Sequence, residues 1–417
     1  MSTFVGFGFG PIQAGLFLYE AQQSGAFDRL VVAEIAPERV DALRRAGGVF
    51  HLNIAHADRI ERISVGPAEI YNPHVEADRA ALVDAVAQAA EIATAIPSVR
   101  FYAGDGPGSL HRVLAAGIAR KHAQKGPQAV VYAAENNNHA AEILTAAVEG
   151  EIADPPQARR YVNFLNTVVG KMSGVKPVGG RDNLVPFTPG ADEAFLVEAF
   201  NHILVTRPSL PRLPGRPPYA RQITVFDEKD DLLPFEEAKL YGHNALHATA
   251  AYLGWMKGLD DMAQLSAAPD ILLLARQAAQ DEAGAALCRR YAGLDPLFTQ
   301  AGFAEYVDDL LLRMVNPYLR DAIERVARDP VRKLAWHDRL IGAMRLALTA
   351  EREPEALAMG AAAAYAYWAT IDPALANHPM AATLSQLWAV DQPDETEQDT
   401  ILLRLHAAGE ALAALQA

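Results

Sequence analysis

The first half of the chain alternates short apolar strands with helices, and this alternation restricts the possible fold more than any other feature. An apolar strand at Thr3–Phe7 is followed by glycines and by a helix over about residues 12–21. A second strand at Leu30–Ile35 and a second helix at Pro37–Ala46 repeat the pattern, and further pairs follow. Such alternation is typical of a parallel sheet with helices on both faces. We therefore predict an α/β, doubly wound, Rossmann-like N-terminal domain.

The pattern changes in the second half of the chain. The segment 206–222, TRPSLPRLPGRPPYARQ, carries five prolines and cannot form a regular helix. It is either a linker or a chain that lies along a surface. From Pro234 onward the pattern is helical almost to the end. We expect an N-terminal domain over residues 1–190 and a mostly α-helical C-terminal domain over residues 191–417.

Bulk properties exclude several classes of protein. A chain of 417 residues is long enough for two hydrophobic cores. The net charge of −14 argues against a nucleic-acid surface. No run of 18 apolar residues predicts a membrane span, no N-terminal targeting signal is evident, and the single cysteine, Cys288, cannot form an internal disulfide. We expect a cytoplasmic protein, a monomer or a weak homo-oligomer, with no nucleic-acid or membrane partner.

A glycine-rich turn, Gly8-x-Gly10-x-x-Gln13, connects the first strand to the first helix. Dinucleotides bind at this place in such sheets. The first glycine permits the tight turn, the second lets the backbone approach the pyrophosphate, and the helix N-terminus faces the phosphates. Gln13 stands where a third glycine is usual. We expect Gly8, Gly10 and Gln13, with Pro11 and Ile12 at the helix start, to bind the cofactor.

The choice of cofactor depends on the end of the second strand. Glu34 lies there, in the segment VVAEI. A carboxylate at this position accepts hydrogen bonds from the ribose 2′-hydroxyl of NAD and repels the 2′-phosphate of NADP. Arg39, about one turn further on, could instead accommodate that phosphate. On balance the sequence favours NAD.

The segment 235–254, FEEAKLYGHNALHATAAYLG, has few helix breakers and predicts one helix. It carries Lys239, Asn244 and His247, which at about 100° per residue fan over roughly 140° of an α-helix surface. One face thus offers a possible base, an amide donor and an imidazole to one small ligand. Oxidising a secondary alcohol without a metal needs such groups, because a base takes the hydroxyl proton and fixed donors hold the developing oxyanion.

The Lys-x4-Asn-x2-His spacing resembles that of the polyol-specific long-chain dehydrogenase/reductase family. The resemblance reaches from the first residue to about position 345. Its further motifs are FVGFGFGPIQAGLFL at the N-terminus, AAENN at 133–137, NPYLRDAIERV at 316–326 and DPVRKLAWHDRL at 329–340.

This resemblance implies roles for individual residues. Lys239 is the catalytic base, and Asn244 is one donor to the substrate oxygen. Asn136, which follows the strand AVVYA, is the second donor. His247 orients a substrate hydroxyl, and Glu236 takes part in proton release.

The resemblance also implies a substrate pair, mannitol 1-phosphate and fructose 6-phosphate, interconverted with NAD and without a metal. Two departures leave the substrate open: the third fingerprint glycine is absent, and the segment AFNHILV at 199–205 lacks a tryptophan expected in the family. An unphosphorylated polyol or a hexuronate remains an alternative.

A basic cluster could bind a substrate phosphate. Within DPVRKLAWHDRL and the residue before it lie Arg328, Arg332, Lys333 and Arg339. Arg and Lys bind phosphate through charge-assisted hydrogen bonds, and we expect Arg332 and Lys333 to do so. Equally, these side chains could be solvated helix ends that form salt bridges within the helical domain.

Two other functions compete with this interpretation. His243 and His247 stand four residues apart and could share a zinc ion, although the Glu of an HExxH motif is missing. A protein of the same fold could also sense NAD(H) without catalysis, because a fold does not fix a function.

Overall fold

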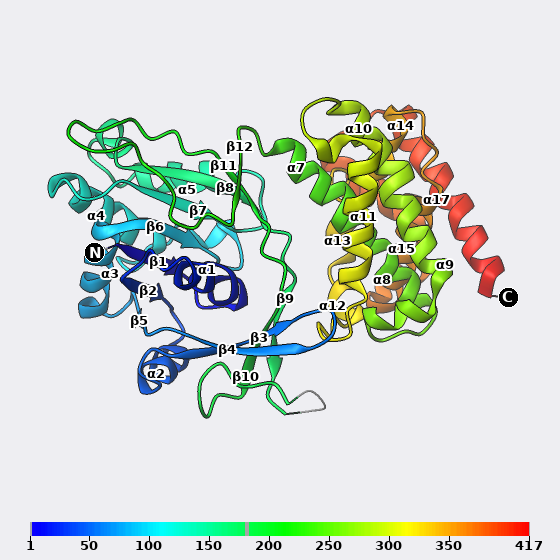
Figure 1. Cartoon of the computed structure of the whole chain (residues 1–417). Helices are drawn as coiled ribbons and strands as arrows, with labels where there is room; N and C mark the ends of the chain where they lie inside the picture. Colours follow the sequence, from blue (N-terminus) through cyan, green and yellow to red (C-terminus); the bar gives the residue numbers. More distant parts are fainter. Residues whose placement is uncertain (1, 180–182, 417) are drawn as a thin grey trace. The chain divides into compact units, whose positions relative to one another are not determined.

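The computed structural model describes residues 2–179 and 183–416. Its contacts divide the chain into two compact units, residues 1–232 and residues 233–417 (Figure 1). The boundary at residue 190 expected from the sequence lies inside the first unit. The difference arises because strands after residue 190 still pair with strands of the N-terminal part.

The first unit is built on an eight-stranded sheet with the order β12-β11-β8-β7-β6-β1-β2-β5. All of its strand pairs are parallel except that β11 runs antiparallel to β8. The strands are β1 Thr3–Phe7, β2 Arg29–Ala33, β5 Ala68–Tyr71, β6 Ala89–Thr94, β7 Ala129–Ala133, β8 Val162–Val168, β11 Leu204–Thr206 and β12 Asp227–Lys229.

Helices cover both faces of this sheet, which confirms the predicted doubly wound architecture. Neighbouring residues of a strand point to opposite faces of the sheet and belong to separate apolar clusters. On β1, Phe4 lies in one cluster and Val5 in the other; on β7, Val130 and Val131 are divided in the same way. The helical segments of the unit are η1 Gln13–Leu18, α1 Tyr19–Gln23, α2 Pro37–Arg45, α3 Glu76–Gln88, η2 Val99–Phe101, α4 Leu110–Ala123, α5 Ala140–Glu149 and α6 Pro155–Ala158.

A second, smaller sheet belongs to the same unit. It has four strands in the order β4-β3-β10-β9, with the bounds β3 Phe50–Ala55, β4 Ile60–Val65, β9 Ser173–Pro177 and β10 Glu193–Glu198. Its β10 pairs with β3 in parallel and with β9 antiparallel. Residues after position 190 thus complete a sheet begun before residue 60.

The proline-rich segment lies along the first unit and is not a free linker. The buried carboxylate of Glu91 on β6 accepts the backbone N–H groups of Gln222 and Ile223, and it also accepts the hydroxyl of Tyr132 at 2.8 Å. Gln128 donates its side-chain amide to the carbonyl of Pro211 at 2.8 Å. Burial raises the pKa of Glu91.

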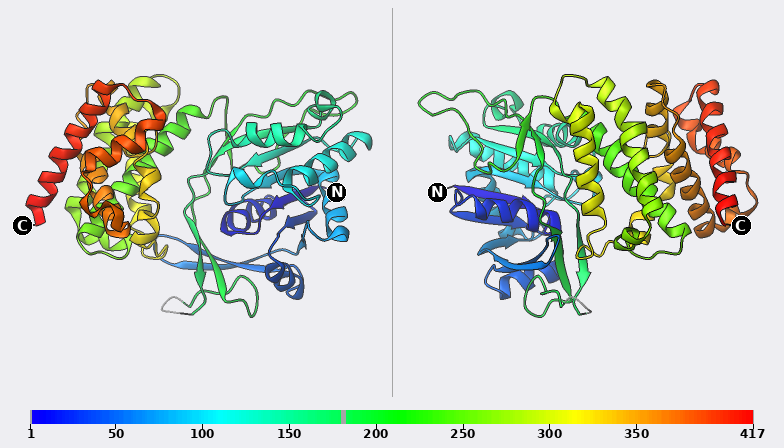
Figure 2. Two further views of the ribbon diagram at one scale, coloured as in Figure 1. Left: turned by 180° about the vertical axis from the view of Figure 1, so that it is seen from behind. Right: turned by 45° about the vertical axis from the view of Figure 1, so that its right-hand side comes forward.

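The second unit is helical, as predicted (Figure 2). Its segments are α7 Leu233–Glu237, η3 Ala238–Asn244, α8 Ala245–Met256, η4 Met262–Ala267, α9 Pro269–Arg276, η5 Gln277–Gly284, α10 Ala285–Arg290, η6 Pro296–Phe298, α11 Gln300–Met314, α12 Ile323–Ala327, α13 Pro330–Lys333, α14 Ile341–Thr349, α15 Glu355–Ile371, η7 Pro373–Asn377, α16 Met380–Trp388, η8 Ala389–Asp391 and α17 Glu395–Gln416.

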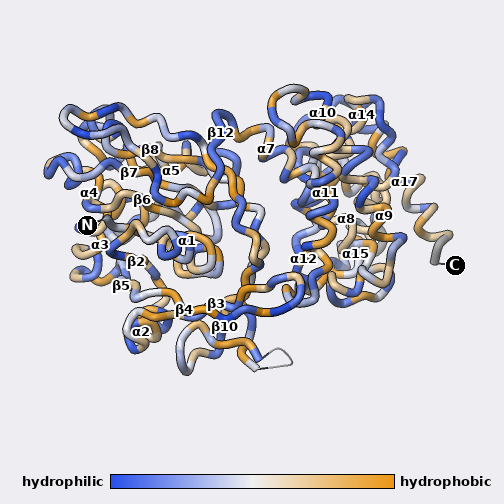
Figure 3. The backbone as a smooth tube through the Cα atoms, in the orientation of Figure 1, coloured by the Kyte–Doolittle hydropathy of each residue, from blue (hydrophilic) through white to orange (hydrophobic). Residues whose placement is uncertain are grey.

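The alanine-rich α15 is a core helix of this unit. Gly360 lets it approach α8 closely, since a Cβ at that position would stand 2.5 Å from the hydroxyl oxygen of Thr249. Apolar stretches lie inside both units, as two separate cores require (Figure 3). Among the described residues, no helix is long and apolar enough to cross a membrane.

Candidate active site

The turn after β1 has the geometry of a nucleotide-binding turn. Gly8 adopts a φ of +87°, and its N–H donates to the carbonyl of Ala33 at 2.9 Å. A Cβ at Gly8 would stand 2.7 Å from the Ala95 carbonyl oxygen, so both its conformation and its surroundings require glycine. At Gly10, no described atom apart from its own chain neighbours lies within 4 Å of a built Cβ, and the helix begins at Pro11. The backbone at Gly10 is therefore open to a ligand.

Gln13 faces the protein interior. Its side chain is fully buried against Gly6 of β1, and neither atom of its amide has a hydrogen-bond partner among the described residues. It begins η1, a π-helical segment over Gln13–Leu18. A contact from Gln13 to a nucleotide would have to come from its backbone.

Glu34 fastens the turn after β1 to the end of β2. Its carboxylate accepts the N–H of Phe9 at 3.0 Å, and it also accepts the N–H groups of Ile35 at 2.7 Å and Ala36 at 2.9 Å. A carboxylate has about four lone-pair sites. One site therefore remains for a ribose hydroxyl.

Asn136 stands on a loop that a buried glutamate holds in place. The neighbouring Glu135 accepts the hydroxyls of Tyr102 and Thr94, the latter at 2.8 Å, and the N–H of Ile96 at 2.9 Å. Burial raises the pKa of Glu135, although these hydrogen bonds oppose the rise. Asn136 itself is exposed. Sequence analysis missed Thr94 and Tyr102; the position of Thr94 at the end of the adjacent strand was the available signal.

Lys239 and Asn244 lie on one continuous helix, as predicted, but its local form differs from the expected α-helix. Residues 238–244 form the π-helical segment η3 between α7 and α8. A π-helix bonds residue i to residue i+5, so it brings residues five apart closer to one face than an α-helix does. Lys239 and Asn244 are five residues apart. The roughly 140° that an α-helix would place between them around its axis therefore overstates their angular separation.

The amine of Lys239 is suited to act as a base. Although the side chain as a whole is partly exposed, burial of the ammonium group lowers the pKa of Lys239 to about 8. The positive charge of Arg339 adds to this effect, and the buried Glu236 opposes it. Burial and the neighbouring positive charges also lower the pKa of His243 well below its ordinary value, which keeps that imidazole neutral.

His247 faces a buried carboxylate that sequence analysis did not single out. Its Nε2 lies 3.4 Å from Oδ2 of Asp321, close enough for electrostatic attraction, although the geometry does not make a hydrogen bond. Arg325 donates to the other oxygen of Asp321 at 2.6 Å. Burial alone would raise the pKa of Asp321, but His247 and Arg325 hold it below its ordinary value. Asp321 and Arg325 lie in the 316–326 motif, which was the only signal.

The residues expected to bind phosphate are already engaged within the second unit. Arg332, half exposed, pairs with Asp329 at 3.0 Å, and Arg339 pairs with Asp338 at 2.7 Å. Lys333 is buried and donates its amine to the carbonyl of Arg328. Burial, with Arg339 and Arg332 nearby, lowers the pKa of Lys333 to about 7.

The two histidines of the zinc alternative lie near one another. The ring centroids of His243 and His247 are 6.1 Å apart. Within the described part of the chain, no group of three or more His, Cys, Asp or Glu side chains is placed to hold a metal ion. A zinc site here would thus need ligands other than these side chains.

Comparison with known proteins shows that the chain is similar to mannitol dehydrogenases. Residues 231–404 match the mannitol dehydrogenase C-terminal domain family. The chain is 29% identical over 375 residues to mannitol-1-phosphate 5-dehydrogenase of Brevibacillus brevis, covering 87% of this chain and 85% of the relative. It is 30% identical over 251 residues to the enzyme of that name from Halalkalibacterium halodurans, covering 60% of this chain and 61% of the relative.

Solved structures share the fold at lower sequence identity. Mannitol 2-dehydrogenase of Pseudomonas fluorescens, in a ternary complex with NAD and D-mannitol, matches with a TM-score of 0.71 at 17% identity, over 99% of this chain and 92% of that one. A D-sorbitol dehydrogenase in substrate-free form matches with a TM-score of 0.67 at 15% identity, over 87% and 79%. The matched domain, the sequence relatives and the motifs together support a relationship between this chain and the polyol dehydrogenases.

Proposed function

We propose that the protein is an NAD-dependent dehydrogenase that interconverts a polyol or polyol phosphate and the corresponding ketose. The observation that carries this proposal is Lys239 on a π-helical turn, with its pKa lowered to about 8 and with Asn244 five residues further on. An amine of this kind is neutral for a useful fraction of the time near neutral pH, as a general base must be.

The first unit offers residues that suit NAD. The turn at Gly8 and Gly10 and the helix start at Pro11 and Ile12 would receive the pyrophosphate, and the remaining lone pair of Glu34 would accept a ribose hydroxyl. When bound, NAD supplies the acceptor for the hydride that leaves the secondary carbinol. The solved relative from Pseudomonas fluorescens is a complex with NAD.

Lys239 handles the proton. Its neutral amine takes the proton from the substrate hydroxyl as the hydride leaves the same carbon, so that the carbinol becomes a ketone and Lys239 becomes an ammonium. Asn244 would donate a hydrogen bond to the oxygen while negative charge develops on it, and the family resemblance gives Asn136 the role of a second donor. Glu236, buried and electrostatically coupled to Lys239, would help return the proton to solvent. These steps need no metal ion.

His247 would hold a second substrate hydroxyl. With Nε2 3.4 Å from Oδ2 of Asp321, the other ring nitrogen of His247 would face the ligand. The nearby negative charge attracts the imidazole and would help to set how the ring is turned, a common role for an acidic partner of histidine. Asp321 is in this view a positioning residue, and Arg325 keeps it ionised.

The proposed substrate pair is mannitol 1-phosphate and fructose 6-phosphate, in line with the names of the two sequence relatives. One observation favours an unphosphorylated, uncharged polyol instead. Arg332 and Arg339 already pair with carboxylates, and burial favours the neutral form of Lys333. A location in the cytoplasm and a monomeric or weakly oligomeric state stay predictions from the sequence.

The decisive experiment is NADH oxidation with fructose, fructose 6-phosphate, mannose, fructuronate and tagaturonate. We expect turnover with fructose 6-phosphate above all. NADH binding, seen by its fluorescence, without turnover on any of these compounds would favour the NAD(H)-sensing alternative.

A further inference from the structure

Arg39 stands beside the expected nucleotide site. It lies in the first turns of α2, close after Glu34, and its Nη1 is 3.5 Å from the carbonyl oxygen of Phe9, between Gly8 and Gly10. The 2′-phosphate of NADP would occupy the region in which Glu34 receives the ribose hydroxyl of NAD. An arginine at this place is suited to bind such a phosphate.

The guanidinium of Arg39 is held by a residue from a distant part of the chain. Its Nη2 lies 2.7 Å from Oε2 of Glu193, the first residue of β10 in the smaller sheet. The side chains of Arg39 and Glu193 are 24% and 44% exposed, so solvent can reach the pair. The guanidinium also lies over the ring of Phe195, 6.0 Å from its centroid.

The pairing with Glu193 makes Arg39 less able to bind a phosphate. The carboxylate of Glu193 cancels the charge of the guanidinium and occupies one of its donor nitrogens. A 2′-phosphate would have to displace Glu193 or lie next to its negative charge, and like charges this close repel. The ribose hydroxyl of NAD carries no charge and meets no such penalty.

We propose that Glu193 is a specificity-determining residue, which favours NAD over NADP by neutralising Arg39. The inference rests on the proposed function in that it assumes a dinucleotide at the turn after β1. Glu34 is a poor place to test cofactor choice, because its carboxylate also fixes three backbone N–H groups of the turn and the following loop. Glu193 can be changed without disturbing them.

The test is Glu193→Gln, which keeps the size of the side chain and removes its charge. We expect the Kd for NADPH to fall about tenfold, the value of roughly one new charge-assisted hydrogen bond. We expect the Kd for NADH to stay within about twofold, because its uncharged ribose hydroxyl meets no comparable repulsion. Both constants are measured by cofactor fluorescence on the full chain, without substrate.

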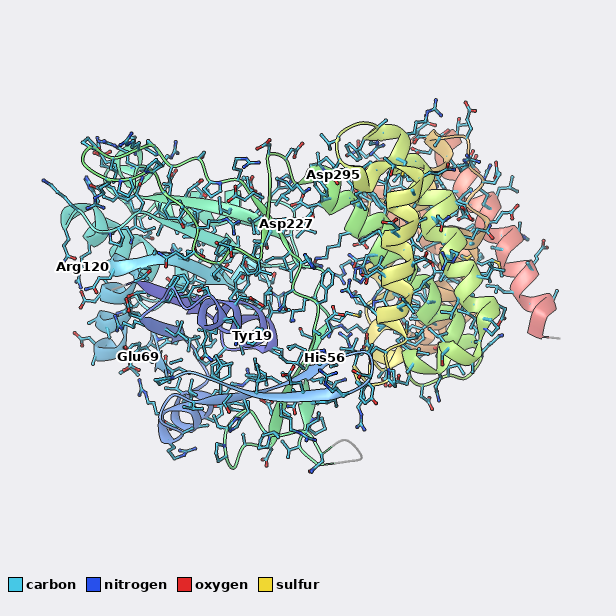
Figure 4. All side chains as sticks on the ribbon, in the orientation of Figure 1. Tyr19, His56, Glu69, Arg120, Asp227 and Asp295 are labelled. Carbon is cyan, nitrogen blue, oxygen red and sulfur yellow. The ribbon has the colours of Figure 1, made fainter. Side chains whose placement is uncertain are left out.

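A matched control exists in the same unit. Arg29 and Glu69 also form an Arg–Glu pair, at 2.6 Å with exposures of 30% and 42%. Arg29 is the first residue of β2, whereas Glu34 follows its last residue, so this pair lies at the opposite end of β2 from Glu34. Glu69 belongs to β5 and is labelled in Figure 4. Glu69→Gln removes the same charge and should leave the Kd for NADPH unchanged.

The double variant Arg39→Gln/Glu193→Gln should lose the gain in NADPH affinity. The inference is overturned if Glu193→Gln leaves the Kd for NADPH unchanged, if the gain survives without Arg39, or if Glu69→Gln produces the same gain. It is also overturned if the unmodified protein binds NADPH more tightly than NADH. Because binding is measured without substrate, a protein that binds NADH but turns over no polyol would refute the proposed activity while these constants still decided the role of Glu193.

Discussion

The two units prepare their candidate sites in different ways. In the first unit, the nucleotide-binding turn is defined by backbone: a glycine with φ of +87°, an open approach at Gly10, and N–H groups fixed by Glu34. In the second unit, the proposed chemistry belongs to side chains on one helix, and residues distant in sequence act on them: Arg339 helps to lower the pKa of Lys239, and Asp321 lies 3.4 Å from His247.

Both units contain a π-helical segment, and the two segments differ in how far their side chains are buried. Each unit carries a π-helical segment within its motif, η1 over Gln13–Leu18 and η3 over Ala238–Asn244. All residues of η1 are buried, whereas Lys239 and Asn244 of η3 are partly exposed. The same local geometry thus packs a core in one unit and presents functional groups in the other.

If the second unit supplies the catalytic base, loss of that base should lower turnover strongly and leave cofactor binding unchanged. We expect Lys239→Ala to lower the oxidation rate roughly 10²–10⁴-fold, the usual scale for a general base. The Kd for NADH should change little, because the cofactor residues belong to the first unit. Lys257→Ala is the matched control, since Lys257 follows α8 and pairs with the surface residue Asp270. Near-normal turnover in Lys239→Ala would refute the mechanism.

The same base predicts the pH dependence of the reaction. A pKa of about 8 means that Lys239 is mostly protonated below pH 8 and mostly neutral above it. Oxidation of the polyol needs the neutral amine and should rise as the pH passes through about 8; reduction of the ketose needs the ammonium and should fall over the same range. Opposite pH profiles of kcat/KM in the two directions are the measurement.

Asn136 is an exception to the division in which the first unit binds the cofactor and the second unit supplies the chemistry. It belongs to the first unit but is proposed to act in the chemical step. We expect Asn136→Ala and Asn244→Ala each to lower turnover on the order of 10²–10³-fold, the cost of one missing oxyanion donor. The loss should fall on kcat, because the charge develops in the transition state. The exposed neighbour Asn138, changed to Ala, is the control. A change confined to KM would make the residue concerned a binding residue.

Residues that act only through another side chain should matter less. We expect Asp321→Asn to raise KM for the sugar about tenfold, the value of roughly one charge-assisted contact, and to change kcat less. His247 then loses the carboxylate that orients it. Steady-state kinetics give the split between KM and kcat, and thermal unfolding checks the fold. Asp321→Glu should restore part of the affinity. An equal loss in kcat would argue for a direct part in the chemistry.

A smaller effect is expected at the basic cluster. Because Arg332 is half exposed and already paired with Asp329, Arg332→Ala should raise KM for fructose 6-phosphate several-fold, less than a buried phosphate ligand would. KM for fructose should stay nearly unchanged, and Lys333→Ala should show the same selectivity. Equal kinetics of the unmodified protein on fructose and fructose 6-phosphate would refute phosphate recognition.

No effect is expected from metal removal. Activity should survive prolonged treatment with EDTA, because the amine of Lys239 and two amide donors replace a Lewis acid in the proposed mechanism. Activity that disappears and returns with added zinc would instead favour a site at His243 and His247.

Features that depend on residues close together in the chain could be predicted from the sequence. Strand–helix alternation predicted the doubly wound sheet, because the side-chain period differs between a strand and a helix. The tight turn required Gly8, since only glycine adopts its φ without strain. The Lys-x4-Asn-x2-His pattern located one helix and its candidate chemistry, because residues this close in sequence lie on the same helix; the angle between them was not predicted, since residues 238–244 form a π-helical segment.

The surroundings of these residues could not be predicted, because they depend on contacts between distant parts of the chain. The first unit extends to residue 232 because β10, β11 and β12 pair with strands from much earlier in the chain. Burial turned Gln13 inward and, with Arg339, lowered the pKa of Lys239. Asp321 came to face His247, and Glu193 came to hold Arg39. Burial and charge act through space, and the sequence order of the groups involved carries little information about either.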